Sequence, residues 1–195
     1  APVVDAQGRL VTGPSVSPEN TYTLADGTTG RMCLGPSMDT QILEYLLRAS
    51  AQAAEILEID PEFRAQADAV RARLPQPAIG RHGQLMEWSE DYEEAEPGHR
   101  HISHLWALHP GEAISPLKTP ELAQAARVSL ERRVAHGGGH TRWSRGWVFN
   151  LWGWRDGGEE AIASRGGGER LAAAPGDIAS VAGCEAAVAA AVAAF

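Results

Sequence analysis

The chain has 195 residues, 44% of them hydrophobic and 22% charged, a balance that excludes a disordered tail or a collagen-like fibre. One domain of roughly 150 residues or more accounts for this length, so we expect a single domain. The formal net charge of −8 argues against a nucleic-acid partner, because such proteins place Lys and Arg against the phosphate backbone.

Other broad signals are weak or absent. Cys33 and Cys184 lie far apart and match no zinc or redox spacing, so we interpret them as free thiols. No run of about 20 strongly apolar residues occurs, and no basic segment precedes an apolar one as in a signal peptide. We therefore expect no membrane partner and find no visible targeting sequence.

The first thirty-odd residues are predicted to form a long loop. They lack periodicity and are rich in turn-forming residues, most densely at Gly13-Pro14-Ser15 and Ser17-Pro18-Glu19-Asn20. Long ordered loops in compact domains are often functional, so candidate site residues are sought here.

Two helices that form a hairpin are predicted next. The first begins at Ser37, which can act as its N-cap, and ends near Leu57; its apolar face consists of Met38, Ile42, Leu46, Ala49, Ala53 and Ile56. The second has Asp60 as N-cap and Pro61 at its first position, and it ends at Pro75; its apolar face consists of Phe63, Ala67, Val70 and Leu74.

Three more helices are predicted before residue 156. A short one follows His99 and ends at Pro110-Gly111, and a longer one begins at Pro120 and ends at the glycines 137–139. The last begins near Trp143 and carries Trp147, Leu151 and Trp154 on one face. We interpret Trp143, Trp147 and Trp154 as core packing rather than as a platform for a ligand. No sustained alternation of β type occurs, so the fold class is predicted to be all-α, with long loops gathered at one end around a cleft. Residues 157–195 are Gly- and Ala-rich and receive no fold assignment, although 176–195 suggest a weak helix or a loose tail.

Three segments could carry chemistry. Glu19, in a loop stiffened by Pro18, could donate a proton if its surroundings are apolar, or it is simply a solvated turn residue. Residues 83–94 combine Gln, Trp and Tyr with clustered carboxylates, which suits a sugar but equally an acidic surface loop.

The third segment is His99-Arg100-His101-Ile102-Ser103-His104. A zinc site is conceivable there, but no HExxH pattern occurs and Arg100 would repel a cation. Hydrogen bonds to sugar hydroxyls, or structural hydrogen bonds, are the favoured interpretation. We expect no metal and no cofactor.

In this order the motifs resemble glycoside hydrolase family 95, the inverting α-L-fucosidases. The matching segments are Pro14-Ser15-Val16-Ser17-Pro18-Glu19-Asn20, Gly35-Pro36-Ser37-Met38-Asp39, Ile79-Gly80-Arg81-His82-Gly83-Gln84-Leu85-Met86-Glu87-Trp88 and His99-Arg100-His101-Ile102-Ser103-His104-Leu105. Shorter matches follow at Pro110-Gly111, at Thr119-Pro120-Glu121-Leu122 and at Trp143-Ser144.

The resemblance implies part of an (α/α)6 toroid, with residues 1–156 as the later portion of the catalytic domain. It implies that Glu19 is the general acid and that Arg100 and His101 contact fucose, so the partner would be a fucosylated oligosaccharide or glycan. It also suggests an extracellular setting.

The sequence departs from the family's pattern on the base side of the site. The family activates water through an Asn-x-Asn motif assisted by an Asp-Gly-Asn-Phe-Gly motif, and neither motif occurs here. Thr141-Arg142-Trp143-Ser144 also stands where the family usually has Thr-Gly-Trp-Ser. We therefore expect an α-L-fucosidase-type hydrolase fragment that lacks the base side and is inactive alone; the alternative is a non-catalytic carbohydrate-binding remnant.

Overall fold

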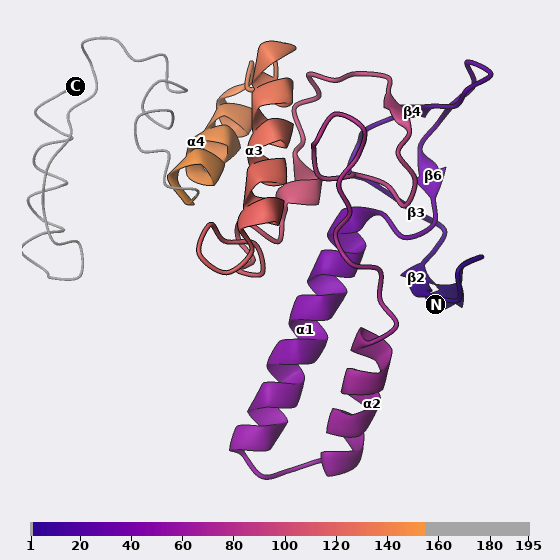
Figure 1. The fold of residues 1–195 in the computed structure, drawn as a ribbon, viewed down its shortest axis with the longest axis vertical. Coiled ribbons are helices and arrows are strands. Elements are labelled where there is room, and N and C mark those ends of the chain that lie inside the picture. Colours follow the sequence, from indigo (N-terminus) through magenta and orange to yellow (C-terminus); the bar gives the residue numbers. More distant parts are fainter. Residues whose placement is uncertain (1, 155–195) are drawn as a thin grey trace, which may run out of the picture.

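The computed structural model describes residues 2–154, and the predictions for residues 157–195 lie outside them. Four α-helices form within these residues (Figure 1): α1 (Ser37–Ile56), α2 (Pro61–Arg71), α3 (Pro120–Ala135) and α4 (Arg142–Trp154). A short 3-10 helix, η1 (Ser103–Leu105), lies where a short helix was predicted. Each of the four helices begins within one residue of its predicted start, because Pro and Gly punctuate the sequence at those points.

The prediction of an all-α fold, part of an (α/α)6 toroid, is wrong for the described residues. Short antiparallel sheets accompany the helices, so the fold is mixed. Their strands are β1 (Pro2–Val4), β2 (Leu10–Thr12), β3 (Ser15–Val16), β4 (Tyr22–Thr23), β5 (Thr29–Gly30), β6 (Met32–Cys33) and β7 (Glu93–Glu94). β1 pairs with β2, β3 pairs with β6, and β4 lies between β5 and β7.

The sequence did not predict these strands because none is longer than three residues. An alternation of period two needs about four residues or more to be recognised. Only partners elsewhere in the chain complete the ladders: Ser15 pairs with Cys33, and Thr23 pairs with Glu93. The opening segment, predicted to be a loop, is therefore held to the body by β pairing.

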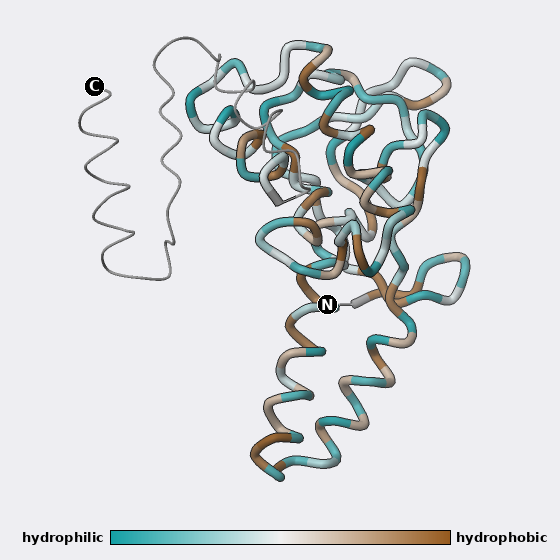
Figure 2. Tube along the Cα trace, turned by 60° about the vertical axis from the view of Figure 1, so that its left-hand side comes forward, coloured by the Kyte–Doolittle hydropathy of each residue, from teal (hydrophilic) through white to brown (hydrophobic). Residues whose placement is uncertain are grey.

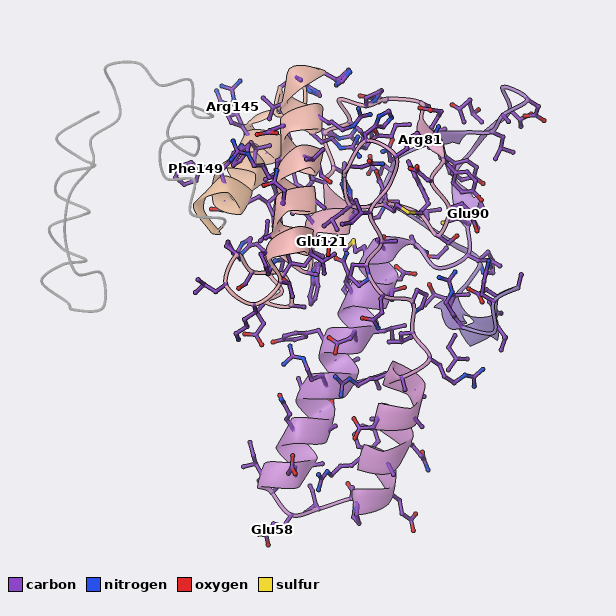
Figure 3. All side chains as sticks on the ribbon, viewed as in Figure 1. Glu58, Arg81, Glu90, Glu121, Arg145 and Phe149 are labelled. Carbon is purple, nitrogen blue, oxygen red and sulfur yellow. The ribbon has the colours of Figure 1, made fainter. Side chains whose placement is uncertain are left out.

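The hairpin of α1 and α2 extends from the rest of the molecule, with Glu58 at its far tip (Figures 1 and 3). Small side chains line its interior: Ala51, Ala54 and Ala67 are buried. Much of the predicted apolar face of α1 is instead exposed; Leu46 is 55% and Ile56 81% accessible. Figure 2 shows hydrophobic residues as brown segments along this hairpin.

The hydrophobic core lies where α3 and α4 run side by side (Figure 1) and pack on the segment 102–114. Leu105, Ala126 and Leu130 are fully buried there, and Val148 and Leu151 join them from α4. Among residues 2–154, no helix is both long and apolar enough to cross a membrane. The core therefore fixes η1 and α3, the two elements that flank the candidate site.

Candidate functional site

Glu19 lies in a tight turn of four residues, Ser17–Asn20, between β3 and β4. The backbone N–H of Asn20 donates to the carbonyl oxygen of Ser17 at 3.1 Å and closes the turn. Glu19 itself has a φ of 37°, a left-handed conformation that non-glycine residues adopt only at some cost. Ser17 and Asn20 are both buried, whereas the Glu19 side chain is 59% exposed. Glu19 therefore extends its carboxylate from a turn whose first and last residues are buried.

The structure brings Glu19 together with Arg100 and His101, as the sequence analysis predicted. The Arg100 guanidinium forms an ion pair with Glu19 Oε2, across 81 residues of sequence. Nε2 of His101 lies 3.7 Å from the same oxygen. The backbone N–H of His101 donates to Nδ1 of His99 at 3.1 Å, which fixes the course of this segment. The roles of these three residues toward a sugar stay predictions.

His101 carries little positive charge at neutral pH. Partial burial lowers its pKa below the ordinary value, and the nearby charge of Glu19 opposes this effect without cancelling it. A neutral imidazole can both donate and accept a hydrogen bond. His101 is therefore suited to a hydroxyl group, whereas Arg100 supplies the fixed positive charge of the cluster.

A cavity of about 130 Å³ adjoins this cluster, and three tryptophans contribute to its wall. Pro18 and His101 line it beside the cluster, and Trp106, Trp143 and Trp147 are among the other residues of its wall. The Trp143 ring lies with its centroid 4.6 Å from that of His101. Trp143 is 51% exposed, so our interpretation of the tryptophan stripe on α4 as core is wrong for this residue. Aromatic faces beside polar groups suit a ligand with both an apolar face and hydroxyl groups.

Beneath the turn lies a buried network centred on Glu87. Its Oε1 accepts from Ser17 Oγ at 2.6 Å, and its Oε2 accepts from Asn20 Nδ2 at 3.0 Å and from Arg133 Nη2 at 2.6 Å. Ser17 Oγ also lies 2.9 Å from Ser103 Oγ at the start of η1. The Glu87 carboxylate therefore ties both sides of Glu19 to α3.

Arg133, rather than His104, supplies the positive charge that balances Glu87. Burial lowers the pKa of His104 to about 4, with the Arg133 charge acting in the same direction and Glu87 against it. Burial alone would raise the pKa of Glu87, but the Arg133 charge and the hydrogen bonds from Ser17 and Asn20 hold it below its ordinary value. At neutral pH the network thus contains an ionised Glu87 beside a neutral His104.

Most carboxylates of residues 83–94 are engaged in ion pairs with arginines. Asp91 and Glu93 both pair with Arg81, and Glu94 pairs with Arg132 and Arg133. Arg81 and Glu90 lie on the strand side of the molecule (Figure 3). Within residues 2–154 no three His, Cys, Asp or Glu side chains approach closely enough to hold a metal ion.

Sequence reasoning missed the network beneath Glu19. Arg133 reads in sequence as a basic residue in the last turn of a helix, where it would complement the helix dipole. Ser17 and Asn20 read as turn formers. The spacing of these residues along the chain gave no signal that they share one buried carboxylate.

Two comparisons with known proteins agree with the motifs. A family model described as the glycosyl hydrolase family 95 catalytic domain matches residues 3–165, nine residues beyond the expected boundary at 156. The protein named Alpha-L-fucosidase 2 from Arabidopsis thaliana is 37% identical over 146 residues. The matched region covers 74% of this chain and 17% of that protein.

Proposed function

Because the chain belongs to glycosyl hydrolase family 95, we propose that it carries the acid side of an α-L-fucosidase-type site. Glu19 is the general acid, and Arg100 and His101 bind the sugar. The observation that supports this assignment is the contact of Glu19 with both residues at the edge of the tryptophan-lined cavity. The likeness to a protein named as an α-L-fucosidase supports fucosylated glycans as substrate.

In this proposal the substrate's glycosidic oxygen lies against Glu19. Glu19 donates its proton to that oxygen as the bond to the anomeric carbon breaks, and the aglycone leaves as a neutral alcohol. A water molecule attacks the anomeric carbon from the opposite face and gives its proton to the base, so the configuration inverts. Acid and base in such a pair stand roughly 6.5–9.5 Å apart, which leaves room for the water.

The base comes from outside these 195 residues in our proposal. Both oxygens of Glu87 are occupied by Ser17, Asn20 and Arg133, and Asp91 accepts hydrogen bonds from Arg81 and Gln84. Neither carboxylate can therefore activate water. Residues 1–156 would act as the later portion of a longer catalytic domain whose other segments supply the Asn-x-Asn and Asp-Gly-Asn-Phe-Gly motifs.

Hydrolysis of 4-nitrophenyl α-L-fucoside tests whether these residues supply only the acid and other segments supply the base. A single acid contributes about 10²–10⁴-fold, whereas enzymes typically reach 10⁶-fold or more. We expect no measurable turnover by the 195 residues alone, and turnover when the two missing motifs are restored in the same chain. Turnover by the 195 residues alone would contradict the proposal.

Glu19→Gln in the restored enzyme tests the acid itself. We expect loss of hydrolysis for fucosides with alkyl leaving groups, retained hydrolysis of α-L-fucosyl fluoride, whose leaving group needs little protonation, and unchanged binding of L-fucose followed by tryptophan fluorescence. Glu90→Gln is the matched control, since Glu90 is exposed and lies on the strand side. Equal loss on both substrates would refute the role of Glu19. Fucose binding without turnover in the restored enzyme would instead favour a carbohydrate-binding remnant.

A further inference from the structure

The carboxylate of Glu87 contacts the residues on both sides of Glu19 but not Glu19 itself. Ser17 and Asn20, the first and last residues of the turn, each donate a side-chain hydrogen bond to it, at 2.6 and 3.0 Å. Both are 1% exposed and Glu87 is 5% exposed, so water does not compete for these bonds. Glu19 is held between them in its left-handed conformation.

The donors around Glu87 demand an acceptor with two oxygens. Ser17, Asn20 and Arg133 all donate to it. Asn20 cannot reverse its amide at no cost, because its Oδ1 already accepts the backbone N–H of Thr21 at 2.8 Å. A glutamine at position 87 would offer one oxygen and an NH2 group, which would face at least one of these donors.

The network also ties the turn to the segment that carries His101. Ser17 Oγ lies 2.9 Å from Ser103 Oγ, and His104 Nδ1 lies 3.7 Å from Glu87 Oε2. Arg133 in turn donates to the carbonyl oxygen of Pro97 at 2.9 Å, just before that segment. One buried carboxylate–guanidinium pair therefore holds both sides of the contact between Glu19 and His101.

We propose that Glu87 is a positioning residue that, with Arg133, holds the turn Ser17–Asn20 so that Glu19 faces Arg100 and His101. This inference rests on the proposed function only in treating Glu19 as the general acid. The position of Glu19 beside Arg100 and His101 does not depend on that function. A positioning residue of this kind acts through the turn, because neither of its oxygens is free to touch a substrate.

The test measures where Glu19 lies rather than what it catalyses. In the 195-residue chain, an NMR titration follows the ring of His101, assigned by comparison with His101→Gln. The charged groups that act on this ring are Glu19, Arg100 and Glu87, and the His99 ring lies beside it. Glu19→Gln should lower the pKa of His101, because it removes the nearest negative charge.

The decisive comparison is the effect of Glu19→Gln in a Glu87→Gln background. If Glu87 positions Glu19, adding Glu19→Gln to Glu87→Gln leaves the His101 pKa unchanged, because Glu87→Gln has already moved Glu19 away from His101. If Glu87 acts only through its own charge, Glu19→Gln lowers the pKa as much as in the unmodified chain, and the proposal is overturned. Glu94→Gln is the matched control: it removes a partner of the same Arg133 without touching the turn, so the Glu19 effect should persist there.

A second variant covers the case in which Glu87→Gln does not fold, as judged by circular dichroism. Ser17→Ala with Asn20→Ala keeps the pair of Glu87 and Arg133 but removes both ties to the turn. We expect the effect of Glu19→Gln on His101 to disappear in this background, and its persistence would overturn the proposal. These measurements follow the His101 pKa and require neither turnover nor fucose binding. They therefore test the position of Glu19 even if the chain is not part of an α-L-fucosidase.

Discussion

Replacing Arg133 with methionine should destabilise the chain severely although the helix keeps a side chain of similar length. Arg133 is 1% exposed and donates to Glu87 Oε2 and to Glu94 Oε1, each at 2.6 Å. Its removal leaves the carboxylate of Glu87 buried without a positive partner. Breaking a buried pair in this way costs about 3–5 kcal/mol, which is a large part of the stability of an ordinary domain.

Arg132→Met is the matched control, since it precedes Arg133 in α3 and pairs with the same Glu94 at 3.0 Å. Its side chain is 25% exposed, and pairs near the surface contribute about 1 kcal/mol or less. Urea unfolding of both variants measures the difference. Adding Glu87→Gln to Arg133→Met should restore part of the lost free energy of unfolding, because no unpaired Glu87 charge is then buried. If Arg133→Met costs no more than Arg132→Met, the buried pair is not the anchor that we describe.

Further predictions concern pH and glycine positions. His104 has a pKa of about 4 in the folded chain against an ordinary 6.5, so the unfolded chain binds the additional proton and the free energy of unfolding falls as pH drops from 6.5 to 4. The loss amounts to about 3 kcal/mol, and urea unfolding across this range should show a slope that His104→Gln reduces; an unchanged slope would exclude His104 as its source. Gly98→Ala should destabilise by about 1–3 kcal/mol, because its Cβ would lie 2.0 Å from the carbonyl oxygen of His136. Gly146→Ala, where a Cβ meets nothing within 4 Å on exposed α4, should instead stabilise by about 0.5–1 kcal/mol; thermal unfolding that ranks the two variants the other way would contradict this reading.

Local sequence signals determined where the helices lie, because their cause is local. Pro61 and Pro120 stand at first helical positions, and the glycines after His136 end α3. Which face of a helix is buried is not a local property. Leu46 and Ile56 fit the predicted apolar stripe of α1, yet they are exposed. Gln41 is buried instead, and its side chain bonds the backbone of His104 and Ala107.

The resemblance of the motifs predicted that Glu19, Arg100 and His101 belong to one site, and the structure places Glu19 against the other two. Only the tertiary structure decided how Glu19 is held. Two-residue strands acquire their pairing from segments far away in the sequence: Tyr22 pairs with Glu94, 72 positions away, and Thr23 pairs with Glu93, 70 positions away. Likewise, Ser17, Asn20 and Arg133 gain their roles from one buried carboxylate, that of Glu87, to which all three donate hydrogen bonds. Burial and charge pairing depend on which surfaces meet, and that is settled by packing rather than by the order of residues along the chain.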